Sequence, residues 1–244
     1  MRIWPLEEVS GRTIVVADLH GCYDEALLLL KTVGAGPEDR VIFVGDLVDR
    51  GPKPRECVDL AMSYGHCVLG NHEEKHLRQR YSPEGKLNPG HLDTRRALEP
   101  RHYEWLETLP LGLLLPEYNA LVVHAGLFPD TPLSEQQSYH LLHIQHIEPP
   151  HPKSHWPSKA PASASFWTNH WKGPERVIFG HSVFDRPLVL PHAVGIDTGA
   201  CFGGGLTALV LPEWRTVTVP SRDYSSGQKL VAKYPIQDGV MAYS

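Results

Sequence analysis

The chain has 244 residues, of which 41% are hydrophobic and 21% are charged, and its formal net charge is −5. A chain of this length can bury a core without disulfides, and its four cysteines do not follow the spacing of a zinc finger or a CxxC redox motif. The acidic balance, the lack of a long basic run and the lack of a stretch of about 18 apolar residues argue against a nucleic-acid partner and a membrane span. We therefore expect a reduced, cytoplasmic protein with a single domain over residues 1–244 and a core over about residues 13–221. The sequence indicates no particular oligomeric state.

The first 80 residues alternate between short apolar runs and segments of helical composition. The apolar runs predict strands at residues 13–17, 41–44 and 67–69. Between and after them we expect helices at residues 25–33, 54–64 and 73–80, the first of which ends at Gly34. This order predicts parallel strands joined by crossover helices.

Beyond residue 120 the pattern changes to strands without helices between them. Strands are expected at residues 121–123 and 177–179, separated by a long irregular stretch that includes a Pro-rich and His-rich loop at residues 140–155. Four short strands follow, at residues 188–190, 193–196, 206–211 and 217–219, whereas the segment after residue 221 has no assignment. We expect an α/β fold of two packed sheets with helices on the outer faces.

Polar motifs follow five of the predicted strands. In open α/β sheets ligands bind beyond the carboxyl ends of the strands, so these motifs are expected to converge on one rim. The motifs are Asp18-Leu19-His20, Asp46-Leu47-Val48-Asp49-Arg50, Asn71-His72-Glu73, His124-Ala125-Gly126 and Gly180-His181-Ser182.

The oxygen and imidazole donors in these motifs suit two adjacent divalent ions. Asp46 is the candidate for a carboxylate that bridges two ions about 3.5–4 Å apart, an arrangement that acidifies a water for attack on phosphorus. Asp18 and His20 would complete the ligands of the first ion. The second ion would take three further ligands, which are Asn71, His124 and His181.

Three residues are candidates for the remaining catalytic work. Arg50 can form a bidentate fork with phosphate oxygens. His72 is suited to protonate the leaving oxygen as a general acid, and Asp49 to keep that imidazole oriented and protonated. Each motif alone has a simpler interpretation: Asp-x-His as a turn, Asn71 as a helix cap, a strand-end histidine as a buried structural group. Their joint occurrence in this order favours the catalytic interpretation.

Taken together, the motifs resemble the phosphoprotein phosphatase family of the calcineurin-like metallophosphoesterases. The family pattern is Gly-Asp-x-His-Gly, Gly-Asp-x-x-Asp-Arg-Gly, Gly-Asn-His-Glu, His-Ala-Gly or His-Gly-Gly, and Gly-His, and it covers residues 18–181. The resemblance implies a four-layer α-β-β-α sandwich of two mixed sheets flanked by helices. It also implies two divalent ions (Mn, Fe, Zn or Mg, with Mn favoured in vitro), the metal ligands and acid pair named above, and direct attack by activated water.

Residues 195–204, 206–209 and 216–221 are similar to the bacterial-type branch of this family, which holds bis(5′-nucleosyl)-tetraphosphatases and small protein phosphatases. We therefore expect a hydrolase of phosphate esters or anhydrides, closest to the tetraphosphatases, that acts on a phosphorylated small molecule. A serine/threonine protein phosphatase acting on a phosphoprotein is the main alternative, and a polyphosphatase is another. A catalytically dead binding scaffold is disfavoured because every residue of the motifs is present.

The sequence departs from the family pattern at three places. Ala17 replaces a Gly before the first Asp, and Val183 stands where Pro is common. The family also supplies a second phosphate-binding Arg upstream of the last Gly-His, but residues 163–169 contain none, which leaves Lys172 and Arg176 as doubtful substitutes. This absence predicts weaker or altered phosphate binding, for which histidines of the 140–155 segment would be candidates to compensate.

Overall fold

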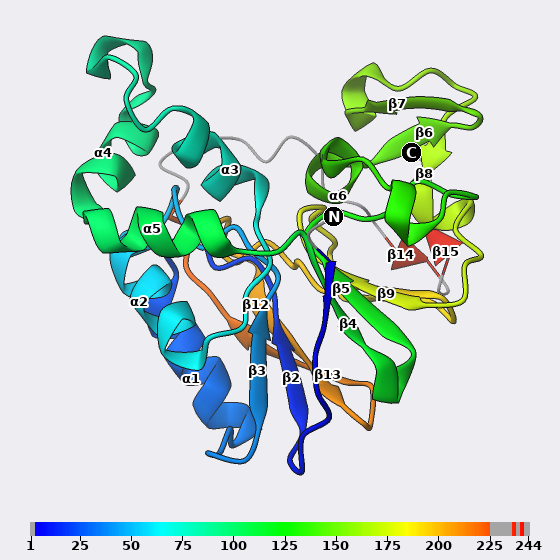
Figure 1. Ribbon diagram of the computed structural model, residues 1–244, viewed down its shortest axis with the longest axis horizontal. Coiled ribbons are helices and arrows are strands. Elements are labelled where there is room, and N and C mark those ends of the chain that lie inside the picture. Colours follow the sequence, from blue (N-terminus) through cyan, green and yellow to red (C-terminus); the bar gives the residue numbers. More distant parts are fainter. Residues whose placement is uncertain (1–2, 225–235, 238–239, 242–244) are drawn as a thin grey trace.

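The computed structural model describes residues 3–224, 236–237 and 240–241 (Figure 1). Its centre is a four-stranded mixed sheet in which β2 and β3 are parallel and the other neighbours are antiparallel. All residues of β2 and β3 are buried, as expected for continuous apolar runs that are covered on both faces. The strand order is β13 (Arg215–Pro220), β12 (Gly205–Leu211), β2 (Thr13–Val16) and β3 (Arg40–Phe43).

A second, six-stranded sheet is also mixed. Its central strands β5 and β9 are parallel, while β4 pairs with β5 and β10 pairs with β11 in antiparallel register. The order is β1 (Ile3–Pro5), β4 (Gly112–Leu115), β5 (Ala120–Val123), β9 (Arg176–Phe179), β11 (Ala193–Gly195) and β10 (Leu188–Val189).

Helices cover the outer face of the four-stranded sheet. Helix α1 (Tyr23–Val33) packs on β12 and β13, and α2 (Pro54–Tyr64) packs on β3. Gly34 closes α1 with φ of 63°, a left-handed conformation in which Gly carries no steric penalty. Two further helices, α4 (Pro89–Ala97) and α5 (Pro100–Thr108), pack against α2, and α3 (Asn71–Arg78) packs against α5 (Figure 1).

A smaller unit lies on the other side of the molecule from α3, α4 and α5 (Figure 1). It consists of α6 (Ser138–His143) and a three-stranded antiparallel sheet in the order β7-β6-β8. The strands are β6 (His146–Glu148), β7 (His151–His155) and β8 (Ser165–Phe166). A separate pair, β14 (Ile236–Gln237) and β15 (Val240–Met241), is antiparallel.

The predicted fold class, an α/β sandwich of two mixed sheets with helices, is confirmed. The strand expected at residues 67–69 is wrong, because a single bridge from Phe43 to Cys67 replaces it and the Leu69 N–H donates to Pro110 instead. The irregular loop expected at residues 140–155 is also wrong, since α6 and the hairpin of β6 and β7 occupy it. The strand β7 escaped prediction because it is largely exposed and therefore lacks an alternating apolar pattern.

The helix expected at residues 73–80 begins and ends two residues earlier than predicted. Helices α4 and α5 and strands β1 and β4 were not predicted. The single-domain assignment remains a prediction, and most of the segment after residue 224 lies outside the described residues. Within the part of the chain that the structure describes, no helix combines the length and the apolar character that crossing a membrane requires.

Candidate active site

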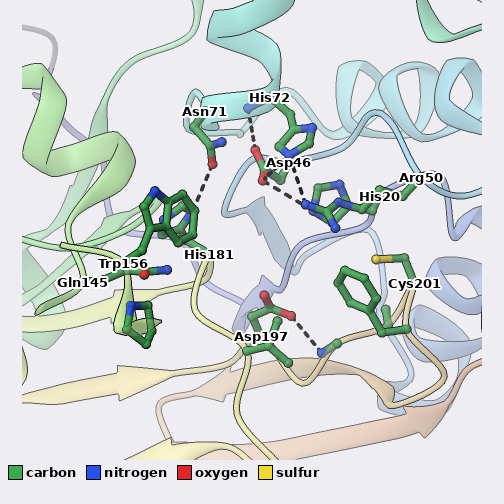
Figure 2. Close-up of a pocket in the computed structure, with 15 residues that line it drawn as sticks. His20, Asp46, Arg50, Asn71, His72, Gln145, Trp156, His181, Asp197 and Cys201 are labelled. Atoms are coloured by element: carbon green, nitrogen blue, oxygen red, sulfur yellow. Dashed lines mark hydrogen bonds and ion pairs between the residues drawn. The ribbon is translucent and has the colours of Figure 1, made fainter. Parts of the chain in front are cut away.

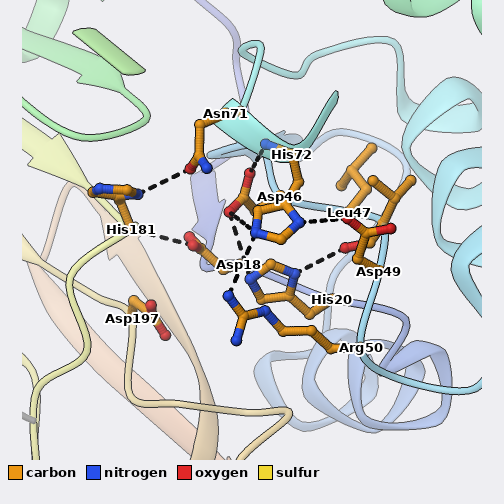
Figure 3. A network of polar contacts seen from close by, with 12 residues as sticks. Asp18, His20, Asp46, Leu47, Asp49, Arg50, Asn71, His72, His181 and Asp197 are labelled. Atoms are coloured by element: carbon orange, nitrogen blue, oxygen red, sulfur yellow. Dashed lines mark hydrogen bonds and ion pairs between the residues drawn. The ribbon is translucent and has the colours of Figure 1, made fainter. Parts of the chain in front are cut away.

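Side chains of four of the five predicted motifs lie close together in Figure 3, and His124 of the remaining motif is 3.5 Å from Asp46. Their loops are tightly turned: five of the eight described non-glycine residues with positive φ belong to the predicted site. Such backbone conformations cost about 1–3 kcal/mol each and persist only where surrounding structure imposes them. The five residues are His20, Asp46, Asp49, Arg50 and His181.

Asp46 follows β3 and lies at the centre of the cluster. Its Oδ2 is 3.5 Å from Nε2 of His20, and its Oδ1 is 3.5 Å from Nε2 of His124. Oδ1 also accepts a hydrogen bond from the backbone N–H of His72 at 2.9 Å. One buried carboxylate thus faces imidazoles from two different loops, as a ligand shared by two ions must.

His20 and His124 each have more oxygen neighbours than hydrogens to donate. Nδ1 of each ring lies 2.8 Å and 2.9 Å, respectively, from a buried backbone carbonyl. Burial lowers the pKa of both rings, that of His20 to about 3, so each is neutral and has a single N–H. Nε2 of His124 nevertheless lies 2.8 Å from Oδ1 of Asn71. Lone pairs therefore face lone pairs, and a cation between them would satisfy both.

Three neighbouring residues, Asn71, His181 and Asp18, also carry acceptor atoms that lack a hydrogen-bond donor or share one. Oδ1 of Asn71 is also 3.0 Å from Nδ1 of His181, whose Nε2 is buried with no hydrogen-bond partner among the described residues. Asp18 accepts the backbone N–H of His181 through Oδ2 at 3.0 Å, while its Oδ1 is buried and, within the described residues, unpartnered. Burial and the nearby Asp197 and Asp46 carboxylates raise the pKa of Asp18 well above its usual value. These unsatisfied acceptors fit metal ligands.

The predicted acid pair is in contact. Nδ1 of His72 lies 2.6 Å from Oδ2 of Asp49. Burial lowers the pKa of His72, but the Asp46 and Asp49 carboxylates outweigh it, and the net shift is upward. Nη2 of Arg50 lies 3.4 Å from Nε2 of His72, and its guanidinium stands 4.9 Å from the Phe202 ring centre. The Arg50 guanidinium and the His72 imidazole, whose pKa is raised, therefore stand side by side next to Asp46.

Comparison with known proteins decides the family. Residues 11–185 match the family described as calcineurin-like phosphoesterase. The chain belongs to the calcineurin-like phosphoesterase family. This membership confirms the prediction of a metal-dependent phosphoester hydrolase, and it implies divalent metal ions, for which the buried acceptors described above are suited.

Alignments with individual relatives cover most of this chain. A protein of Geobacillus thermodenitrificans named bis(5′-nucleosyl)-tetraphosphatase PrpE [asymmetrical] is 30% identical over an alignment of 235 positions that covers 85% of this chain and 93% of the relative. A protein of the same name from Anoxybacillus flavithermus is 29% identical over 234 residues, with the same coverage. A solved structure assigned provisionally as a diadenosine tetraphosphatase has 30% identity and a TM-score of 0.75, covering 91% of this chain and 98% of that one. A yeast serine/threonine phosphatase, at 20% identity and a TM-score of 0.58, shares the fold.

The site opens into a pocket of about 680 Å³, part of it open to solvent (Figure 2). Among its described lining residues Arg50 is the one Arg or Lys. Lys172 and Arg176, the doubtful substitutes for a second phosphate-binding Arg, do not line it. Arg176 instead lies 4.0 Å over the Trp214 ring and donates to the Leu190 carbonyl. The histidines of the 140–155 segment do not line this pocket either.

Sequence reasoning gave no role to Glu73, which organises the second motif of the phosphoesterase. This fully buried carboxylate accepts the backbone N–H groups of Asp46, Leu47, Val48 and Gly70 at distances from 2.8 to 3.2 Å. Burial and the Asp46 charge raise the pKa of Glu73 to about 8, whereas the N–H groups stabilise the ionised form. Its place directly after Asn-His was the available sequence signal.

Two further groups were also missed. Asp197 lines the pocket and accepts the Gly199 N–H at 2.9 Å, and burial raises the pKa of its carboxyl to about 6. His76 lies 2.7 Å from Oδ1 of Asp49 and stacks on His91 with 3.5 Å between ring centres. Asp197 belongs to a segment that carries the family resemblance, whereas the meeting of His76 with His91 depends on helix packing.

Proposed function

We propose that this calcineurin-like phosphoesterase hydrolyses a phosphate anhydride of a dinucleoside polyphosphate, using two divalent ions and activated water. The observation that carries the proposal is the convergence of buried imidazole nitrogens and carboxylate and amide oxygens, two of which, Oδ1 of Asp18 and Nε2 of His181, have no hydrogen-bond partner among the described residues. Divalent cations would satisfy these acceptors, which supports a shared metal centre.

The residues present fit two metal positions. The first would take Asp18, His20 and Asp46, and the second Asp46 together with three ligands that end other loops. Manganese is the ion expected to support activity in vitro. When bound, such ions polarise phosphate oxygens and lower the pKa of water. The remaining ligands of the second position are Asn71, His124 and His181.

The chain's own groups bind the phosphate and deliver the proton. We assign the binding of phosphate oxygens to Arg50, a role supported by its position in the lining of the same pocket as Asp46. His72 Nδ1 lies 2.6 Å from Oδ2 of Asp49, a contact that favours the protonated ring, and Nε2 on the other side of the ring would give its proton to the leaving oxygen.

The substrate class is supported by the relatives, which are named for cleavage of bis(5′-nucleosyl)-tetraphosphates. Among the described residues that line the pocket, Arg50 is the one Arg or Lys side chain. An internal phosphate of a polyphosphate chain carries less charge than a terminal dianion and needs fewer cations to bind. A serine/threonine phosphatase activity is the alternative. We infer a cytoplasmic location as part of this proposal, supported by the four free thiols.

The test measures metal binding and substrate preference together. Asp46→Asn is expected to bind fewer than two manganese ions by calorimetry and to lose activity, whereas Asp130→Asn, an exposed control that also has positive φ, should behave like the wild type. Wild-type enzyme with manganese is then offered diadenosine tetraphosphate, a phosphothreonine peptide and polyphosphate. Preference for the peptide would overturn the proposed substrate class, and full activity of Asp46→Asn would overturn the shared metal centre.

A further inference from the structure

A second hollow adjoins the active-site pocket. It is lined by Tyr139, His143, Gln145, Ser154, His155 and Trp156. Gln145 and Trp156 also line the active-site pocket, so these two side chains form a wall common to both hollows (Figure 2). The wall comes from the unit of α6 and the three-stranded sheet, to which the metal and acid chemistry assigns no role.

Trp156 presents a large apolar plane at this wall. The residue is 47% exposed, and its ring centre lies 6.1 Å from that of His181, a proposed metal ligand. Tyr139, which also lines the second hollow, is 50% exposed. Exposed aromatic planes next to a phosphate site suit the stacking of nucleobases, each of which has a π-face.

Gln145, unlike the exposed Trp156, is a buried polar residue, and one of its side-chain atoms lacks a hydrogen-bond partner among the described residues. The residue is 5% exposed, yet Oε1 has no hydrogen-bond partner within the described part of the chain. Its backbone is fixed on both sides: its N–H donates to Oγ of Ser154 at 2.8 Å, and its carbonyl accepts the Trp167 N–H at 2.9 Å. A buried acceptor without a partner is unfavourable, and a donor group on a bound ligand would satisfy it.

The chemistry of the amide also limits what it recognises. A carboxamide both donates and accepts hydrogen bonds, whereas phosphate oxygens at neutral pH only accept. Ribose hydroxyls and base edges offer donors as well as acceptors. The buried acceptor of Gln145 is therefore matched by a nucleoside and not by a phosphate group alone.

We propose that Trp156 and Gln145 form the nucleoside-binding wall of the enzyme, with Trp156 stacking on a base and Gln145 hydrogen-bonding the base edge or ribose. This inference rests on the proposed function and names the part of that substrate which sets specificity. The contact of Trp156 with His181 places a stacked base beside the phosphate that reacts.

The test compares two substrates that share a phosphate chain and differ in nucleosides: diadenosine tetraphosphate and inorganic tetraphosphate, both with manganese. Trp156→Leu is expected to raise KM for diadenosine tetraphosphate about tenfold and to leave the kinetics with inorganic tetraphosphate unchanged. Trp156→Phe, which keeps a ring, should restore most of the affinity. Gln145→Leu should raise the same KM several-fold.

Trp4→Leu is the matched control, because Trp4 is 44% exposed on β1 and lines neither hollow. Equal effects of Trp156→Leu on both substrates, or no effect on either, would overturn the inference while leaving the tetraphosphatase proposal intact. A wild-type enzyme that cleaves the phosphothreonine peptide but not diadenosine tetraphosphate would instead overturn the proposed function itself.

Discussion

Oδ1 of Asp49 accepts a hydrogen bond from Nε2 of His76 at 2.7 Å, on the carboxylate oxygen that His72 does not use. His72 and His76 are one turn apart on α3, so the same helix contacts both oxygens. His91, from α4, stacks on His76 at 3.5 Å and an interplanar angle of 11°. Asp49 is therefore clamped, and its orientation toward His72 does not depend on substrate.

Removing this clamp should weaken the acid function without touching the proposed metal ligands. In His76→Leu one carboxylate oxygen loses a charge-assisted hydrogen bond, normally worth about 1.5–3 kcal/mol, and Asp49 is free to rotate. We expect kcat to fall about tenfold for phenyl phosphate, a poor leaving group, and much less for p-nitrophenyl phosphate. His151→Leu, an exposed substitution on β7, is the control. Equal slowing of both esters would assign His76 a structural role alone.

The predicted site residues could be found from the sequence because topology alone brings them together. Asp18, Asp46, His124 and His181 all follow apolar runs, and the ends of such strands meet at one edge of a sheet. Local apolar patterns made three elements predictable. The pattern is continuous in strands β2 and β3 and periodic in helix α2.

The remaining features depend on packing that no local pattern encodes. Glu73 reaches the Asp46 loop because α3 begins close to the point where β3 ends. The stacking of His76 on His91 requires α3 and α4 to be adjacent. The Trp156 wall depends on β7, which is exposed and begins just after the Pro149-Pro150 turn. Such a strand resembles a loop in sequence.

Glu73→Gln should destabilise the protein and disturb the Asp46 loop. The Glu73 carboxylate accepts hydrogen bonds from four backbone N–H groups. In Glu73→Gln the amide NH₂ group would replace one of the two oxygens, and because NH₂ only donates, the N–H groups pointing at it would lose their acceptor. The expected loss is about 2–4 kcal/mol in the free energy of unfolding by urea, together with reduced activity. Glu74→Gln, the next residue on the same helix, should cost less than about 0.5 kcal/mol. A Glu73→Gln enzyme as stable as the wild type would contradict the role of Glu73 as organiser of the loop.

Gly180→Ala tests whether the close approach of backbone to Asp18 matters for metal binding. A Cβ at this position would lie 1.9 Å from Oδ1 of Asp18 and 2.7 Å from Cγ2 of Val44. Asp18 must therefore move, and a displacement near 1 Å in an active site commonly costs about a hundredfold in rate. We expect calorimetry to show one bound manganese ion fewer than in the wild type. We also expect kcat to fall by about a hundredfold. Gly85→Ala, where a Cβ meets nothing within 4 Å, is the control, and unchanged metal binding in Gly180→Ala would contradict the assignment of Asp18 as a ligand.

Asp39 gives the fold a pH-dependent contribution away from the active site. Its carboxylate binds the Arg12 guanidinium and accepts backbone N–H groups of Gly36 and Arg12, and these contacts lower its pKa from 3.8 to about 2. Because the folded-state pKa is depressed, the stabilisation is present above the unfolded value and is lost as the pH falls from 3.8 toward 2. Asp39→Asn should therefore be about 1–2 kcal/mol less stable than the wild type at pH 7, with the difference shrinking toward zero near pH 2. Urea unfolding between pH 7 and pH 2 measures this difference in the free energy of unfolding, with the exposed Asp93→Asn as control. A difference that does not change with pH would show that the lost contacts are not those of an ionised carboxylate.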